Sequence, residues 1–434
     1  MNPVHAGILG IVILIVILFS RFPVAFCMAL VGLVGFGYLV SPQAALNIIA
    51  KDFYTVFSSY DLTVVPLFVF MGQILFYAGI SRKLYDAAHA WLGQYRGGLA
   101  MATVGACACF SAICGSTNAT AATMATVALP EMKRFKYRDE LATGVVAAGG
   151  SLGILIPPSV IFIVYGIMTA QSIGKLFMAG ILPGILLSTL FILTIYIWVS
   201  INPQMAPRVE KQNFKTKIRS LSGLIEVIIL FVLVMGGLFI GIFTPTEAGA
   251  VGALGGVVIP LVRRQLTWQG FLTAIYSSTL TTCMIFMIVA GATVFGHFLA
   301  VTTIPSVLSA WVVGLPLPHW ASMLVVMFFF FIGGCFMDAL GMILLTIPIF
   351  FPVAVALGYD PIWFGVVIVL VTELGVITPP VGINVYVVSG IAKDVPLEKI
   401  FKGAFPFVLT LLAYLIIMII FPEIALFLPG FVAY

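Results

Sequence analysis

The sequence predicts an all-α, multi-pass membrane protein with two inverted-topology repeats, each containing a re-entrant helical hairpin and a broken helix. Hydrophobic residues account for 62% and charged residues for 8% of the 434 residues, a composition outside the range of soluble domains. The cationic residues divide between the ends of the apolar segments as membrane topology requires. In addition, proline and glycine motifs recur at one fixed spacing along the chain.

Apolar stretches define the expected spans. The first, residues 6–19, lacks both a charged leading region and a small-residue cleavage site, so it is interpreted as a span rather than a secretory signal. Because a span needs roughly 20 apolar residues, spans are expected near 5–20, 22–40, 61–79, 141–166, 176–200, 223–241, 245–262, 274–299, 363–390 and 403–427. Residues 99–130 and 320–352 are too long for one span and are interrupted by small or polar residues, which favours hairpins.

Lys and Arg residues orient these spans. With the N-terminus outside, all of the 20 Lys and Arg residues except Lys51 and Lys175 fall in cytoplasmic loops. The net charge of +5 is therefore attributed to this bias, and no nucleic-acid partner is implied. Basic residues flank the first hairpin on both sides, so it is expected to enter from the cytoplasm. The second lies in residues 265–392, which contain no Lys or Arg, and is expected to enter from outside.

An internal repeat links the two halves of the chain. Its members share an offset of 222 residues, and they are Pro23 and Pro245, Pro130 and Pro352, Leu152 and Leu374, Gly153 and Gly375, Pro157 and Pro379, and Pro158 and Pro380. Since the two units begin on opposite sides of the membrane, the repeat is inverted, as in secondary transporters. The predicted organisation is an N-terminal span (1–21), a first repeat (22–166; hairpin 99–130, broken helix 141–166), connecting spans with a basic cytoplasmic loop (167–244), a second repeat (245–390; hairpin 320–352, broken helix 363–390) and a C-terminal span (391–434).

Polar residues gather at the tip of the first hairpin. Residues 115–120 carry hydroxyl and amide groups at the membrane depth expected for the tip, where unpaired polar groups cost several kcal/mol. A binding site would provide partners for Ser116, Thr117, Asn118 and Thr120. The alternatives are small-residue helix packing and, far less favoured, glycosylation at Asn118.

Two Pro-Pro motifs interrupt the broken helices. Gly153 precedes Pro157 and Pro158, and Gly375 precedes Pro379 and Pro380. Proline removes a helical donor, so the preceding carbonyls lose their partners and can bind a sodium ion. The half-helix beyond each break presents its positive N-terminal end to an anion. A plain proline kink is the alternative, and the inverted duplication argues against it.

The second hairpin contains a carboxylate without a nearby cation in sequence. Asp338 aligns with Ser116 at the offset of 222, and an intramembrane carboxylate is a candidate ion ligand or proton carrier. Capping of a hairpin helix is the alternative for Asp338. Glu373 and Glu247 are interpreted as ligands, helix caps or interface residues. The sequence has no phosphate-binding loop for ATP, so the energy is expected from an ion gradient or from another chain.

Four motifs in order resemble one family. The motifs are Gly115-Ser-Thr (with Pro130-Glu-Met), Gly153-Ile-Leu-Ile-Pro-Pro-Ser, Gly241-Ile-Phe-Thr-Pro-Thr-Glu-Ala and Gly375-Val-Ile-Thr-Pro-Pro-Val-Gly. This combination is similar to the large membrane subunit of tripartite ATP-independent periplasmic (TRAP) transporters of the dicarboxylate-carrier type. The resemblance implies a sodium-driven elevator, with a transport domain moving against a scaffold, in the bacterial inner membrane. It also implies a small four-helix membrane subunit, here a separate protein, a periplasmic substrate-binding protein, and import of small organic acids such as C4-dicarboxylates or sialic acid.

The resemblance locates the expected ligands on this chain. It places sodium between each hairpin tip and the neighbouring break. The residues expected to bind sodium are Ser116, Asn118, Gly153, Pro157, Gly334, Asp338, Gly375, Thr378 and Pro379. Those expected to contact the organic acid are Ser116, Thr117, Asn118, Thr120, Ser159 and Asn384. Membrane lipid is the surrounding partner.

Three other interpretations remain open from the sequence. A stand-alone sodium–dicarboxylate symporter or ion antiporter of related fold would work without a binding protein. An intramembrane enzyme would need either a base beside a nucleophile, for example His297 near Ser116, or a metal cluster. A passive scaffold would explain the hydrophobicity but not the duplicated breaks.

Overall fold

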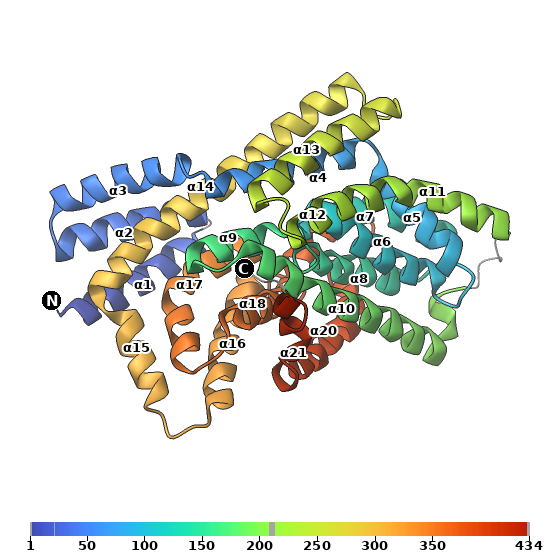
Figure 1. Ribbon diagram of the computed structural model, residues 1–434. Coiled ribbons are helices and arrows are strands. Elements are labelled where there is room, and N and C mark those ends of the chain that lie inside the picture. The colour runs from blue at the N-terminus through green and yellow to red at the C-terminus, as the bar shows by residue number, and fades with distance from the viewer. Residues whose placement is uncertain (1, 21, 208–212, 432–434) are drawn as a thin grey trace.

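The computed structural model describes residues 2–20, 22–207 and 213–431, and every regular element in these ranges is a helix (Figure 1). Arg21, Arg208 and Lys211, which the topology prediction assigned to cytoplasmic loops, lie outside the described residues. Among the described residues, seven helices are long and apolar enough to cross a membrane, or eight if the bent α3–α4 pair counts as one span. Shorter apolar helices account for the other predicted spans.

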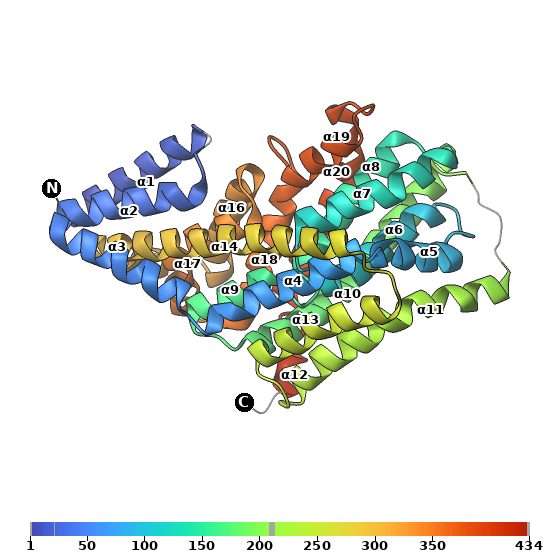
Figure 2. The ribbon, with the colours of Figure 1, turned by 90° about the horizontal axis from the view of Figure 1, so that it is seen from above.

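One group of helices forms a layer along the molecule. The long helix α14 packs against α2, α3 and α4, and α13 packs against α4 (Figure 2). Helices α1, α11 and α12 belong to the same layer. Its members are α1 (Pro3–Phe19), α2 (Val24–Leu39), α3 (Pro42–Phe57), α4 (Val64–Tyr77), α11 (Phe214–Phe231), α12 (Gly237–Phe239), α13 (Pro245–Val262) and α14 (Trp268–Thr302). We call this layer the scaffold. The chain bends by 53° between α3 and α4, whereas α14, their counterpart in the second repeat, is continuous.

The hairpins and broken helices form a second group. The first hairpin is α6 (Gly98–Cys114) with α7 (Thr117–Arg134), and the second is α16 (His319–Phe336) with α17 (Ala339–Ala356). The first broken helix is α8 (Asp139–Gly150), a short 3-10 segment and α9 (Val160–Thr169), and the second is α18 (Pro361–Val376) with α19 (Ile383–Ile391). The starts of α7 and α17 are separated by the same 222 residues as the proline pairs. The remaining helices here are α10 (Ile173–Ile201), α20 (Leu397–Ile420) and the short α21 (Glu423–Leu426).

The two repeats interlock within this group. Helix α19 of the second repeat packs on α7 and α8 of the first, and α20 packs on α8. A side chain at Gly144 on α8 would collide with the backbone of Gly403 on α20. Small residues permit such close helix crossings in membranes, so glycine at this crossing brings the C-terminal span into direct contact with the first repeat.

Two connecting helices join the groups. They are α5 (Ile80–Leu92), which follows α4, and α15 (Ile304–Val313), which follows α14. In α5 the residues Ile80, Leu84 and Tyr85 are buried while Arg82 and Asp86 are exposed. This is the pattern of an amphipathic helix at an interface. The span-by-span sequence prediction left residues 80–92 and 304–313 without an element because neither segment is long enough to cross a membrane.

Helix caps explain several element boundaries. Thr244 and Glu247 form a capping box at the start of α13: the Thr244 amide donates to the Glu247 carboxylate (2.8 Å), and the Glu247 amide donates to the Thr244 hydroxyl (3.3 Å). Pro245 occupies the first helical position, where its missing donor costs nothing. Of the three interpretations of Glu247, the structure therefore shows the helix cap.

Candidate functional site

The tips of both hairpins line one cavity. It measures about 300 Å³ and is lined by residues 114–119 of the first hairpin and 338–340 of the second. The scaffold closes another side through α4 and α14, which contribute the polar side chains of Gln73 and Thr281. The cavity therefore lies where the two inverted repeats and the scaffold meet.

The first tip is shaped by a glycine and a serine. Helix α6 ends at Cys114, and Gly115 adopts φ = 62°, a left-handed conformation that favours glycine. A side chain at Gly115 would also lie 2.7 Å from the Pro158 carbonyl oxygen. Ser116 then caps α7, its hydroxyl accepting from the Ala119 amide at 3.4 Å. The first turn of α7 consequently faces the cavity.

The second tip repeats this arrangement with a carboxylate. Asp338 caps α17 by accepting from the Gly341 amide at 3.0 Å, and it lines the same cavity. Two helix N-terminal ends thus meet at one space, each contributing positive potential that favours an anion. Capping was the alternative interpretation of Asp338, and the structure shows it, while the predicted role as an ion ligand remains a prediction.

Each break glycine lies against a hairpin. A side chain at Gly153 would lie 2.5 Å from the Ser116 carbonyl oxygen, and one at Gly375 would lie 2.5 Å from the Gly334 carbonyl carbon. The peptide bonds Pro157–Pro158 and Pro379–Pro380 are both cis. Four of the residues predicted to bind sodium are therefore brought together in two pairs, and backbone oxygens are the ligands that a hard cation uses at such sites.

Other predicted site residues lie away from the cavity wall. Thr120, Ser159 and Asn384 are fully buried and do not belong to the lining. Ser159 caps α9, and the Asn384 amide donates to the Ala147 carbonyl at 3.1 Å.

Near the second break, Thr378 donates its hydroxyl to the Leu374 carbonyl at 2.6 Å, and Pro379 is exposed. Both positions follow Gly375 directly in the break, where helical hydrogen bonding ends.

A hydrogen bond joins the first hairpin to the second repeat. Thr117 donates its hydroxyl to one carboxyl oxygen of Glu373 at 2.6 Å, and both side chains are buried. The other carboxyl oxygen of Glu373 is buried without a hydrogen-bond partner among the described residues. Glu373, previously assigned three possible roles, is thus an interface residue between the halves of the site.

Scaffold residues at the cavity were missed by the sequence interpretation. Gln73 and Thr281 lie in apolar helices, outside the repeated motifs. The only available signal was that each is a polar side chain within an expected apolar span. His297 pairs instead with Asp52 of α3, at 3.2 Å, and within the described chain the cavity lining contains no histidine. Ser116 therefore has no histidine base there.

Comparison with known proteins adds the family context. Residues 11–424 match the family model described as tripartite ATP-independent periplasmic transporter, DctM component. The C4-dicarboxylate TRAP transporter large permease protein DctM of Pseudomonas aeruginosa is 39% identical over 395 residues, covering 90% of this chain and 91% of that protein. The isethionate TRAP transporter permease protein DctMQ of Oleidesulfovibrio alaskensis is 34% identical, and the match covers 89% of this chain and 60% of that longer protein.

The fold also resembles a solved transporter. The crystal structure of the Alcanivorax borkumensis YdaH transporter, described as having an unusual topology, matches with a TM-score of 0.60. The match covers 89% of this chain and 90% of that one, at 13% sequence identity. This likeness concerns the arrangement of helices alone.

Proposed function

The chain belongs to the DctM component family of tripartite ATP-independent periplasmic transporters, and on this premise we propose that it imports small organic acids driven by sodium. It is a multi-pass protein of the bacterial inner membrane and a transport protein, not an enzyme, because its relatives are named transporter permease proteins. The observation that carries the proposal is the cavity in which both hairpin tips meet.

Sodium would bind where each tip contacts a break. In the first half, Ser116 and Asn118 of the tip would act with Gly153 and Pro157. In the second half, Gly334 and Asp338 would act with Gly375, Thr378 and Pro379. These positions combine backbone carbonyls, hydroxyls and one carboxylate, a donor set suited to a small hard cation.

The organic acid would bind between the N-terminal ends of α7 and α17. Ser116, Thr117 and Asn118 line the cavity there, and helix ends favour carboxylate groups. Thr120, Ser159 and Asn384 lie behind this surface, so their contribution would be to hold the tip and breaks in place.

Asp338 would make anion binding depend on a cation. Two like unit charges about 4 Å apart repel by about 4 kcal/mol at an effective dielectric constant of about 20. A sodium ion beside Asp338 would cancel that repulsion and so raise the affinity for the acid. Coupling of this kind is reciprocal, because the acid would raise the affinity for sodium equally.

The scaffold and the hairpin group would move relative to one another as an elevator. The site is shared between hairpin tips on one side and α4 and α14 on the other, and α5 and α15 connect the two groups. A small four-helix membrane subunit and a periplasmic substrate-binding protein would complete the transporter, and the family description, which names a tripartite periplasmic transporter, supports this. The relatives' names favour C4-dicarboxylates as the first substrates to test.

Reconstituted transport tests this proposal. The protein and its candidate small subunit would be placed in proteoliposomes, with and without a sodium gradient and with and without the binding protein. Uptake of an organic acid that requires both would support the tripartite, sodium-driven function. Sodium-driven uptake by the membrane protein alone would favour the symporter, and equal uptake without sodium would contradict the coupling.

A further inference from the structure

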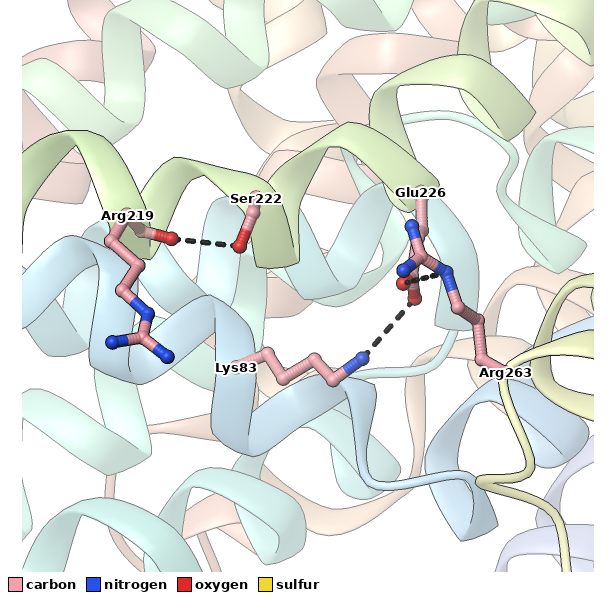
Figure 3. Close-up of polar contacts among 5 residues, drawn as sticks. All are labelled: Lys83, Arg219, Ser222, Glu226 and Arg263. Carbon is pink, nitrogen blue, oxygen red and sulfur yellow. Dashed lines mark hydrogen bonds and ion pairs between the residues drawn. The ribbon is translucent and has the colours of Figure 1, made fainter.

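A second polar cavity lies away from the hairpin site. It also measures about 300 Å³, and it opens where α5, α11 and the turn between α13 and α14 meet (Figure 3). Its charged lining residues are Lys83, Arg219, Arg263, Asp86 and Glu226, and its uncharged polar ones are Ser220, Ser222 and Gln265. With three cations and two carboxylates, the lining has a surplus of one positive charge.

A buried carboxylate fixes two of the cations. Glu226 is 7% exposed and pairs with the Lys83 amine (3.3 Å) and the Arg263 Nε (3.3 Å), as Figure 3 shows. On Arg263, the atom that pairs with Glu226 is Nε. Among the described residues, Arg219 has no carboxylate within 4.0 Å. Arg219 and Asp86 are thus the two charged lining residues that lie outside the ion pairs of Glu226.

The predicted topology assigns the cations of this cavity, Lys83, Arg219 and Arg263, to the cytoplasmic side, and the neighbouring span ends favour the level of the lipid headgroups. Arg263 directly follows the last residue of the candidate span Pro245–Val262. Trp268 begins the next helix and is 73% exposed, and exposed tryptophans gather at membrane interfaces. Just beyond the cavity, α11 exposes Ile225 and Ile229. A charged cavity thus borders an exposed apolar surface.

We propose that this cavity binds the phosphate headgroup of an anionic membrane phospholipid, whose acyl chains lie along the exposed apolar surface of α11 and α13. Arg219, with the free donors of Lys83 and Arg263, would bind the phosphate oxygens, as guanidinium groups do in fork geometry. One negative charge would cancel the surplus of the lining. Because α5 leads into the first hairpin and α11 belongs to the scaffold, the lipid would bridge both groups. This inference does not depend on the transported substrate.

Native mass spectrometry of the purified protein in detergent tests the proposal. Phosphatidylglycerol, which carries one negative charge, is expected to bind more tightly than zwitterionic phosphatidylcholine. Arg219→Gln should weaken phosphatidylglycerol binding about five-fold, the usual contribution of one basic residue near an anionic membrane surface. Arg264→Gln is the matched control: it removes a neighbouring exposed cation that does not line the cavity, and binding should be unchanged.

A second variant tests whether filling the cavity reduces lipid binding when the charge of its lining is unchanged. Ser222 lines the cavity and is exposed, so Ser222→Leu should fill the space without disturbing the core, and it should also reduce lipid binding. Equal binding of phosphatidylglycerol by both variants and the wild type would overturn the proposal. So would displacement of the lipid by inorganic phosphate, which would indicate a free-anion site. Loss of small-subunit binding rather than lipid binding in Arg219→Gln would assign the cavity to a protein contact instead.

Discussion

Replacing Thr117 by valine removes the hydroxyl that joins the first hairpin to the second repeat. Valine preserves the branched shape of the side chain, so the change is confined to the hydrogen bond with Glu373, 2.6 Å long. After the substitution neither carboxyl oxygen of Glu373 would retain the partner seen here, because the second oxygen already lacks one among the described residues. The hairpin tip would then be held by packing and backbone contacts.

The expected magnitude follows from the acceptor. Hydrogen bonds between membrane helices contribute about 0.6 kcal/mol on average and about 1.7 at most, whereas bonds to charged groups contribute about 1.5–3 kcal/mol. Glu373 is 1% exposed, which places this bond at the upper end of the membrane range. We expect Thr117→Val to cost about 1.5–1.7 kcal/mol, equivalent to about a 10- to 20-fold change in the docking equilibrium of the tip.

Two measurements and two controls test this reasoning. Thermal unfolding of the purified protein should show a lower midpoint for Thr117→Val, and sodium-driven uptake should need a higher sodium concentration. Thr117→Ser retains the hydroxyl and should behave nearly as the wild type. Thr126→Val removes an exposed hydroxyl of the same helix that bonds only to the Thr123 carbonyl. If Thr117→Val matched Thr126→Val in both assays, the cross-repeat bond would have no role in positioning the tip.

Three further substitutions probe the site and its support. Gly153→Ala should raise the sodium concentration for half-maximal uptake at least about five-fold, since overpacking costs about 1–3 kcal/mol. The control Gly390→Ala, at a glycine with open space around it, should leave that concentration unchanged. Equal effects of the two substitutions would refute the close contact at Gly153. Asp338→Asn should keep the α17 cap and the unfolding midpoint, because asparagine caps well, but abolish sodium-dependent uptake; sodium-dependent uptake equal to wild type would exclude a role for its charge. Gly144→Val should lower the unfolding midpoint by separating α8 from α20 at Gly403, and an unchanged midpoint would contradict that tight crossing.

The hairpins and breaks were predictable because backbone chemistry marks them in the sequence. Proline cannot donate within a helix, so the Pro-Pro motifs at 157–158 and 379–380 had to interrupt their helices. The second hairpin was predicted from its own interrupted apolar stretch, and the fixed offset of 222 then related it to the first. Small and polar residues at the hairpin tips were predictable as well, since a turn at membrane depth requires them.

Contacts between distant segments were not predictable in this way. The partner of Thr117 lies 256 residues away, and Glu373 alone was equally consistent with a ligand, a cap or an interface residue. Gln73 and Thr281 reach the cavity from scaffold helices that carry no repeated motif. Their placement depends on how the scaffold packs against the hairpin tips, which sequence periodicity does not encode.

Short amphipathic helices were missed for a different reason. The segment 80–92 has buried apolar residues at helical spacing and charged residues between them, but span-length reasoning considers only longer apolar runs. A search for helical periodicity in the connections would have found it. It would also have indicated that Lys83 lies on a helix rather than in a loop.

Direct sodium binding is the measurement closest to the central claim, that the meeting point of the hairpin tips and breaks is the coupling site. Radioactive sodium binding to the purified protein would be compared among the wild type, Ser116→Ala, Asp338→Ala and the control Gly390→Ala. The structure predicts saturable binding that the control retains and the two tip variants weaken or lose, with the organic acid increasing sodium affinity in the wild type. Equal sodium binding by all four proteins would place the coupling ion elsewhere and contradict the account.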